Sequence, residues 1–133
     1  MSKIIYMAHP FGGEKDALDR AREWYRWIYR TQPGVVPVAD WILTIEVLDD
    51  RDPEDRKLGM WANFELIRRC DEIWSVGSGA SKGRDDEVRF ALEEVGIPHL
   101  DLTYLGVDAP DGAVVPPALI MPAKGRPYGC KRN

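Results

Sequence analysis

The clearest alternation of apolar and polar positions lies between residues 70 and 98. A short apolar run ends at Val76, and a loop of small residues with three glycines, 77–83, follows it. Apolar residues then recur at the spacing of one helical face until Gly96, a residue type that commonly ends helices. The pattern predicts a buried strand, a glycine-containing loop and an amphipathic helix from about residue 84 to residue 95. The expected apolar face consists of Val88, Ala91, Leu92 and Val95.

Before this segment, the pattern predicts two strands separated by a helix. Residues 3–8 are typical of a strand and lead directly into a loop that contains His9 and two glycines. Helical spacing of apolar residues follows from about residue 14 to residue 30, and a second short apolar run covers residues 35–38. Residues 39–48 fit either a helix or an extended insert, and we favour a short helix.

A further helix is expected to begin at Pro53. Asp52 is a favourable N-cap, and proline is favourable at the first helical position. This helix should extend to about Arg69, and the last strand is expected at residues 99–102. From Gly106 onward the sequence is rich in proline and glycine, which is typical of an irregular arm.

The order of these elements predicts an α/β fold. Because helices separate the strands, the strands should be parallel and joined by right-handed crossovers, which gives a three-layer sandwich with a flavodoxin-like or Rossmann-like sheet. We expect the strand order 2-1-3-4, which brings the loops after the first and third strands together at the topological switch point. Residues 1–105 form this domain, and residues 106–133 form the arm.

Composition and charge narrow the possible functions. With 133 residues and a net charge of −4, the chain should form one domain without a basic patch for a nucleic-acid polymer. The first apolar run is interrupted too early, at His9 and Pro10, for a signal peptide or a membrane span. Cys70 and Cys130 lack metal-type spacing and are interpreted as free thiols. We therefore expect a cytoplasmic protein without a membrane partner.

Glu87 is the strongest candidate for chemistry. It falls near the start of the predicted helix, at the ligand edge of the sheet, and shares a helical side with Ala91. A carboxylate at this place can attack or stabilise an electron-poor carbon. The alternative is that Asp85, Asp86 and Glu87 only complement the helix dipole. Tyr6 would orient Glu87 from the first strand, or else it is an ordinary strand aromatic.

The loops beside Glu87 carry the candidate binding residues. His9 could hold a phosphate or a base, and residues 78–83 could present backbone N–H groups and a serine hydroxyl to an anion. Asn63 is an amide on an apolar helical stripe. Because the loop matches neither the P-loop nor the dinucleotide-binding pattern, we expect no cofactor and no metal. The residues assigned to substrate binding are His9, Pro10, Phe11, Gly12, Asn63, Ser78, Gly79 and Ser81.

Three stretches taken together resemble the nucleoside 2-deoxyribosyltransferase-like family. The match in order and spacing covers roughly residues 3–100. The family includes the deoxyribosyltransferases, the 2′-deoxynucleoside 5′-phosphate N-hydrolases and small uncharacterised phage and bacterial relatives. The matching stretches are Lys3-Ile4-Ile5-Tyr6-Met7-Ala8-His9-Pro10-Phe11, Cys70-Asp71-Glu72-Ile73, and Ser81 followed by Glu87 and Ala91.

The resemblance implies a role for each matching residue. Glu87 would be the nucleophile that takes the deoxyribosyl group, Tyr6 would orient it, and Ser81 is similar to the serine of the phosphohydrolase branch. Two positions depart from the family pattern, since His9 replaces a glycine and Asn63 replaces an aspartate that handles the proton of the leaving base. An amide can hold a base by hydrogen bonds but cannot deliver a proton.

Two functions from different classes therefore stay open. The first is an enzyme that cleaves or transfers the N-glycosidic bond of a 2′-deoxynucleoside or its 5′-monophosphate through a glutamate nucleophile. The second is a non-catalytic module that binds or sequesters a nucleotide or an ADP-ribose-like ligand. In both, the partner is a small nucleoside or nucleotide. By analogy with the family, we also expect a homodimer or a higher homo-oligomer.

Overall fold

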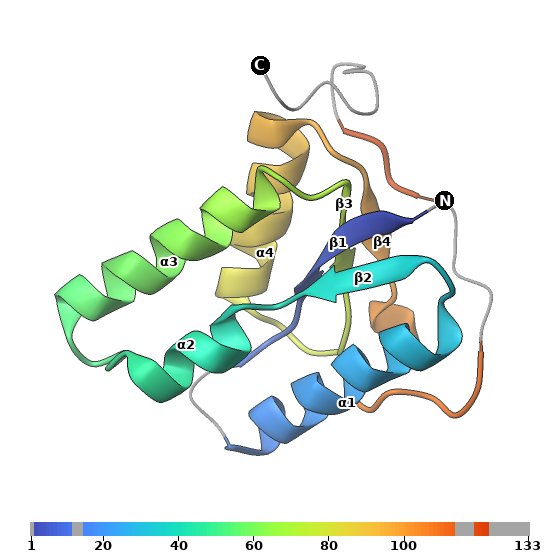
Figure 1. Ribbon diagram of the computed structural model, residues 1–133, viewed down its shortest axis with the longest axis horizontal. Coiled ribbons are helices and arrows are strands. Elements are labelled where there is room, and N and C mark those ends of the chain that lie inside the picture. The colour runs from blue at the N-terminus through green and yellow to red at the C-terminus, as the bar shows by residue number, and fades with distance from the viewer. Residues whose placement is uncertain (1, 12–14, 114–118, 123–133) are drawn as a thin grey trace.

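The protein is built on one parallel sheet, seen in a computed structural model that describes residues 2–11, 15–113 and 119–122 (Figure 1). Neighbouring strands follow the order β2-β1-β3-β4, and each neighbouring pair is parallel. In the central strand, Tyr6 lies opposite Val38 on one side and opposite Ile73 on the other. The predicted α/β fold and strand order are confirmed. The strands are β1 (Lys3–Ala8), β2 (Val35–Val38), β3 (Glu72–Ser75) and β4 (His99–Asp101).

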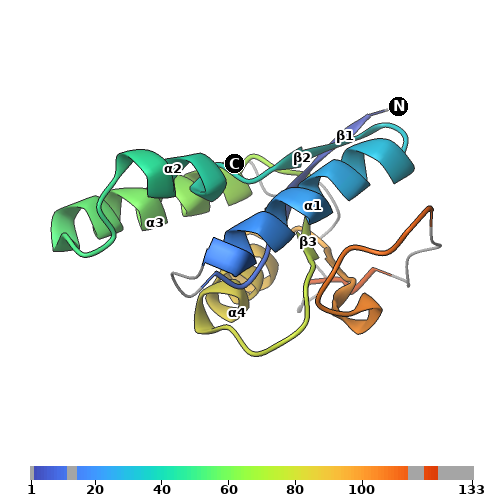
Figure 2. The same cartoon turned by 90° about the horizontal axis from the view of Figure 1, so that it is seen from below.

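Four α-helices cover the two faces of this sheet. Right-handed crossovers place α1 on one face and both α3 and α4 on the other, and Figure 1 shows the strands running between these two groups. Figure 2 shows the same helices from below, with α2 and α3 side by side at one end of the molecule. The helices are α1 (Lys15–Thr31), α2 (Trp41–Val47), α3 (Pro53–Ile67) and α4 (Lys82–Arg89).

The helix starts follow from local sequence. The Asp52 carboxylate caps α3 by accepting a hydrogen bond from the Glu54 N–H at 2.9 Å, and Pro53 occupies the first helical position, as predicted. The ambiguous segment 39–48 contains the short helix α2, which confirms the interpretation we favoured.

The helix predicted from residue 84 to residue 95 differs from the structure in two ways. It begins earlier, at Lys82, because the Ser81 hydroxyl accepts a hydrogen bond from the Arg84 N–H at 3.2 Å. Its last part, Phe90–Val95, is a π-helix. Gly96 has a φ of 84° and donates to the carbonyl of Ala91 at 2.8 Å, and this wider spacing closes the final turn.

The described part of the C-terminal arm is tied to α1. The indole N–H of Trp24 donates to the carbonyl of Val107 at 3.0 Å, and that of Trp27 donates to the carbonyl of Gly112 at 2.9 Å. Both tryptophan side chains are buried and meet edge to face. Residues 106–113 are irregular, as expected, yet they satisfy two buried donors of the core.

The two edges of the sheet differ in how they end. Strand β2 contains Pro37, which pairs with Ile5 in the register of the sheet. At the opposite edge, His99 of β4 forms an isolated antiparallel bridge with Ile120 of the arm. Its two backbone hydrogen bonds measure 2.8 and 2.6 Å.

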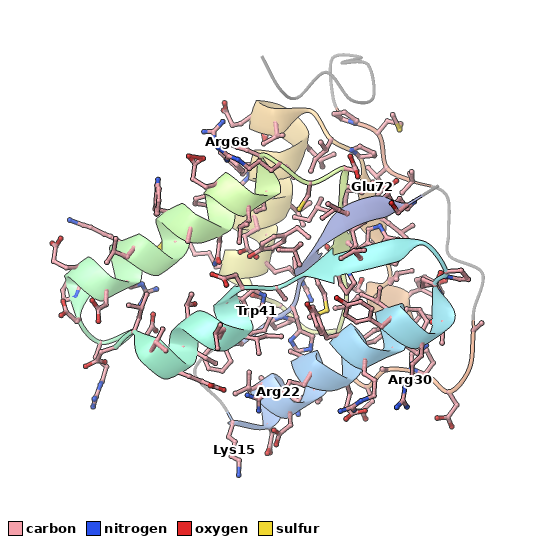
Figure 3. The ribbon with its side chains drawn as sticks, in the orientation of Figure 1. Lys15, Arg22, Arg30, Trp41, Arg68 and Glu72 are labelled. Atoms are coloured by element: carbon pink, nitrogen blue, oxygen red, sulfur yellow. The ribbon has the colours of Figure 1, made fainter. Side chains whose placement is uncertain are left out.

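Strand β3 also contains a buried carboxylate, that of Glu72. The side chain of Glu72 is labelled in Figure 3. It accepts hydrogen bonds from the Lys3 ammonium at 2.9 Å and from the Trp74 indole at 2.8 Å. Cys70 is buried and forms no disulfide with another described residue, whereas Cys130 lies outside the described residues. Among the described residues, no helix has the length and apolar character needed to cross a bilayer.

Candidate functional site

Tyr6 and Glu87 meet between β1 and α4. The Tyr6 hydroxyl donates a hydrogen bond to Oε2 of Glu87 at 2.6 Å. Tyr6 is fully buried because it lies on the central strand, under the helix that follows the neighbouring strand β3. A fixed donor on Oε2 orients the carboxylate, while no described residue binds Oε1. One oxygen of Glu87 is therefore held, and the other can face a ligand.

Burial raises the pKa of Glu87 from its ordinary value of 4.5 to about 7. The Tyr6 hydrogen bond acts in the opposite direction, and the neighbouring charge of Asp86 adds to the rise. The same burial, with the nearby negative charge, raises the pKa of Tyr6 well above 10.0, so its phenol stays protonated and remains a donor. A carboxyl group that titrates near neutral pH can serve as a nucleophile, a base or an acid.

A cavity of about 800 Å³ opens beside this pair. Tyr6 is not one of the residues that line this cavity and lies behind them. Gly79 is exposed and does not line the cavity, and Gly12 lies outside the described residues. The structure brings together in the lining most of the residues singled out by the sequence, namely His9, Pro10, Phe11, Asn63, Ser78, Ser81 and Glu87.

His9 is a neutral imidazole with a defined tautomer. Its Nδ1 lies 2.6 Å from the carbonyl oxygen of Pro10, which can only accept, so Nδ1 carries the proton. The ring stacks on Trp41, with 14° between the planes, and burial lowers the pKa of His9 to about 4. Because Nε2 keeps a lone pair, His9 can accept a hydrogen bond from a ligand. A neutral acceptor is poorly suited to a phosphate, so of the two expected roles of His9, contact with a base fits this geometry better and stays a prediction.

Asn63 presents an unsatisfied group to the same cavity. It projects from the inner side of α3, and its Oδ1 is buried without a hydrogen-bond partner among the described residues. An unpartnered buried acceptor costs about 1–3 kcal/mol, so a ligand that donates to Oδ1 would recover this energy. The side chain predicted to hold a base is thus free to do so.

Arg84 is the residue that the sequence analysis missed. Its guanidinium is buried and donates to the carbonyls of Gly77, at 2.6 Å, and of Gly79, which fixes the loop after β3. No carboxylate lies within ion-pair distance of it among the described residues. The sequence offered one signal for Arg84, its positive charge in the first turn of a helix, because a basic residue at that place opposes the helix dipole.

Ser81 combines two roles at the start of α4. Its oxygen accepts from the Arg84 N–H, so its own proton remains available for a ligand in the cavity. Together with the charge of Arg84, this part of the lining offers donors and positive charge to an anionic group. Asn63 and His9, in the same lining, offer acceptors.

Comparison with known proteins places the chain in a family of unassigned function. The family described as a domain of unknown function, DUF7768, matches residues 3–99. The chain belongs to the DUF7768 family. No curated protein and no solved structure matches it. The matched segment contains every residue assigned to the site, from Tyr6 to Glu87, so these residues lie within the DUF7768 domain of this chain.

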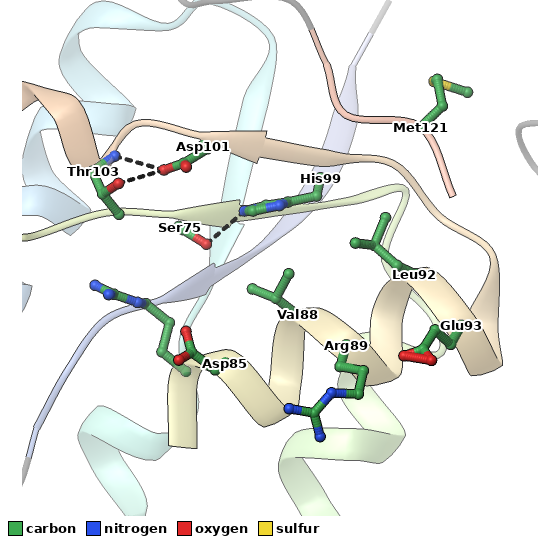
Figure 4. A pocket seen from close by; sticks show the side chains of 11 residues that line it. Ser75, Asp85, Val88, Arg89, Leu92, Glu93, His99, Asp101, Thr103 and Met121 are labelled. Carbon is green, nitrogen blue, oxygen red and sulfur yellow. Dashed lines mark hydrogen bonds between the residues drawn. The ribbon is translucent and has the colours of Figure 1, made fainter. Parts of the chain in front are cut away.

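A second cavity, of about 510 Å³, also has Arg84 in its lining and is shown in Figure 4. There Oγ of Ser75 and Nε2 of His99 are 2.6 Å apart and face each other across β3 and β4. The carboxylate of Asp101 instead accepts from both the N–H and the hydroxyl of Thr103. Because no hydrogen bond joins His99 to Asp101, the three do not form a relay, and the buried Ser75 and His99 pair is a cross-strand contact.

Proposed function

We propose that the cavity beside Glu87 binds a 2′-deoxynucleoside or its 5′-monophosphate and that Glu87 cleaves or transfers its N-glycosidic bond. The observation that carries this proposal is the 2.6 Å hydrogen bond from Tyr6 to Glu87 at the cavity wall. It provides an oriented carboxylate of the kind that retaining glycosidases use. The resemblance of the flanking motifs to the deoxyribosyltransferase-like family supports the same chemistry. A cytoplasmic location and a homo-oligomeric state belong to this proposal as well.

The reaction follows from the two oxygens of Glu87. Oε1 attacks the anomeric carbon through an oxocarbenium-like transition state while Tyr6 holds Oε2. The bond from carbon to the base nitrogen breaks, its electron pair leaves with the base, and the base takes up a proton. Attack by water, or by a second base, on the glycosyl ester then releases the carboxylate of Glu87. Only the ionised carboxylate can start this sequence, so the rate should rise as Glu87 titrates near pH 7.

The polar groups of the lining fit the parts of such a substrate. Oδ1 of Asn63 and Nε2 of His9 would accept hydrogen bonds from the base or the sugar. The hydroxyl of Ser81 and the guanidinium of Arg84 would face a 5′-phosphate, which adds negative charge. The positive charge of Arg84 in the lining supports a monophosphate over a free nucleoside.

The second candidate is a binding module without turnover. Asn63 favours it, because an amide cannot supply the proton that the departing base needs, and general acid catalysis commonly contributes about 10²–10⁴ in rate. His9 is neutral with a pKa of about 4 and does not replace that donor near neutral pH. In this case the same contacts would hold a nucleotide or an ADP-ribose-like molecule.

One experiment separates the two candidates. The protein is incubated with the four deoxynucleosides and their monophosphates, free base is measured by chromatography, and a glycosyl adduct is sought by intact mass. Glu87→Gln should abolish base release while keeping ligand affinity, since the amide loses the charge but keeps the size. The matched control is Asp86→Asn, which neutralises the adjacent carboxylate in the cavity lining and should keep turnover.

Asn63→Asp completes the comparison. If a missing proton donor limits the wild-type rate, this substitution should raise base release. Tight nucleotide binding with neither base release nor adduct, in the wild type and in Asn63→Asp, would reject the enzyme and retain the binding module. Absence of binding to every compound would reject both.

A further inference from the structure

The side of α3 turned away from the cavity has an apolar centre between charged ends. Trp61 is 62% exposed and Leu58 is 52% exposed, and they lie three residues apart on the same face. Asn63 and Gly59, which line the cavity, lie on the opposite side of the helix. We call the outward face the outer stripe of α3. It consists of Glu54, Lys57, Leu58, Trp61, Glu65 and Arg68.

Exposed apolar side chains gather on α3 and on its neighbour α2. On α2, Leu43 is 58% exposed and Val47 is 71% exposed, one helical turn apart. The two helices lie side by side in both views (Figures 1 and 2). A tryptophan carries one of the largest apolar surfaces of any side chain, and exposed apolar groups of this size mark interaction sites.

Along the outer stripe, charged residues at equal distances on the two sides of Trp61 have opposite signs. Glu54 and Arg68 lie two helical turns before and after Trp61, and Lys57 and Glu65 lie one turn before and after it. Each pair has opposite signs. A second α3, antiparallel and related by a twofold axis at Trp61, therefore sets unlike charges opposite each other at all four positions. A parallel second helix in the same register sets like charges opposite each other.

Within one chain these charges contribute little. Lys57 lies 3.6 Å from Glu54, and Arg68 lies 3.3 Å from Glu65. Glu54 and Lys57 are 80% and 77% exposed, so solvent screens their attraction. Arg68 is 52% exposed and also lies over the ring of Phe90, and Glu65 is 37% exposed. Glu54 and Lys57 thus keep their charges available to a partner, and Glu65 and Arg68 do so in part.

We propose that the outer stripe of α3 is a homodimer interface in which two antiparallel copies of α3 meet about a twofold axis at Trp61. The two Trp61 rings stack at the axis, Leu58 packs beside them, and the flanking charges form intermolecular ion pairs. Stable interfaces bury roughly 1,200–2,000 Å², more than one pair of short helices supplies, so this dimer should depend on concentration. This inference rests on the homo-oligomeric state that belongs to the proposed function and names its surface. Because the outer stripe lies apart from Glu87, the dimer can be tested separately from the chemistry of the site.

The test measures molar mass over a wide concentration series by sedimentation equilibrium. The full-length wild type should approach twice the 15.1 kDa of one chain as concentration rises. Trp61→Glu should remain monomeric, because it sets two like charges at the axis. Tyr29→Glu, at an aromatic side chain on α1 that is 53% exposed, is the matched control and should dimerise like the wild type. Far-UV circular dichroism checks that each variant is folded.

Charge reversal tests the register. Arg68→Glu and Glu54→Arg should each weaken the dimer at least about tenfold, because one substitution sets like charges together twice across the axis. The double variant restores unlike charges and should recover the dimer. A wild type that stays monomeric, a dimer that survives Trp61→Glu, or a double variant no tighter than the single ones would overturn the proposal.

Discussion

The imidazole of His9 lies directly against the α-carbon of Gly77. A Cβ built at position 77 would be 2.7 Å from both Cδ2 and Nε2 of His9. Gly77 also has a φ of 76°, a conformation that side chains rarely adopt. The loops after β1 and β3 can therefore approach each other only because position 77 has no side chain.

Gly77→Ala should destabilise the protein and disturb the site. The methyl group would clash with His9 and force a positive φ on alanine, which together should cost about 1–3 kcal/mol or more. Gly83→Ala is the matched control, since Gly83 lies in α4 with open space around its α-carbon, and it should be neutral or slightly stabilising. Urea denaturation measures both. Equal stabilities of the two variants would contradict this account of Gly77.

Tyr6→Phe should raise the pKa of Glu87 above its value of about 7. The hydroxyl of Tyr6 stabilises the ionised carboxylate, and its removal leaves the burial of Glu87 unopposed. Carbon-13 NMR titration of labelled glutamate carboxyls measures this directly, and any base-release activity should shift toward higher pH. Tyr25→Phe, whose hydroxyl donates to the carbonyl of Pro37, is the control and should leave the titration of Glu87 unchanged.

Glu87 should make the folded state less stable as pH rises. Between pH 4.5 and about 7 the folded protein keeps a proton on Glu87 that the unfolded chain has released. The contribution of Glu87 to the free energy of unfolding is therefore fully present below pH 4.5 and is lost by about pH 7, a change of up to about 3 kcal/mol.

Glu87→Gln removes this titration, so its stability relative to the wild type should increase from pH 4 to pH 8. Thermal or urea unfolding across this range measures the difference. Asp86→Asn should not show the same rise, because the Lys82 hydrogen bond lowers rather than raises the pKa of Asp86. A constant difference between wild type and Glu87→Gln would show that the carboxyl group is not perturbed by burial.

Truncation after Leu105 should lower the thermal midpoint. It leaves the indole N–H groups of Trp24 and Trp27 without their carbonyl acceptors, and it removes the bridge between His99 and Ile120. Each lost buried hydrogen bond should cost about 1–3 kcal/mol. A chain that ends at Pro122 keeps these bonds and is the control. If both truncated chains melt like the full-length protein, the arm is dispensable for stability.

The topology of the sheet could be predicted because the right-handedness of crossover connections leaves few possible strand orders. Right-handed crossovers between parallel strands leave a small set of strand orders, and the order that we expected among them, 2-1-3-4, is the one in the structure. The same logic places Tyr6 on the central strand under the helix that starts after β3. The nearness of Tyr6 to Glu87 was therefore within reach of the sequence, while their chemical roles stay predictions.

Other features depend on contacts that no local pattern records. The burial of Arg84 requires the carbonyls of the loop before it to converge on one guanidinium. The neutral state of His9 requires the Pro10 carbonyl and the face of Trp41. The π-helical turn depends on how Gly96 bonds back to Ala91. In each case tertiary packing determines a property that the residue type alone leaves open.

The two edges of the sheet have a consequence for aggregation. An exposed edge strand is a template for strand addition between molecules. On β2 this template is interrupted by Pro37, which has no N–H to donate, and on β4 a position is already occupied by Ile120. Both margins of the sheet therefore disfavour β-pairing between molecules.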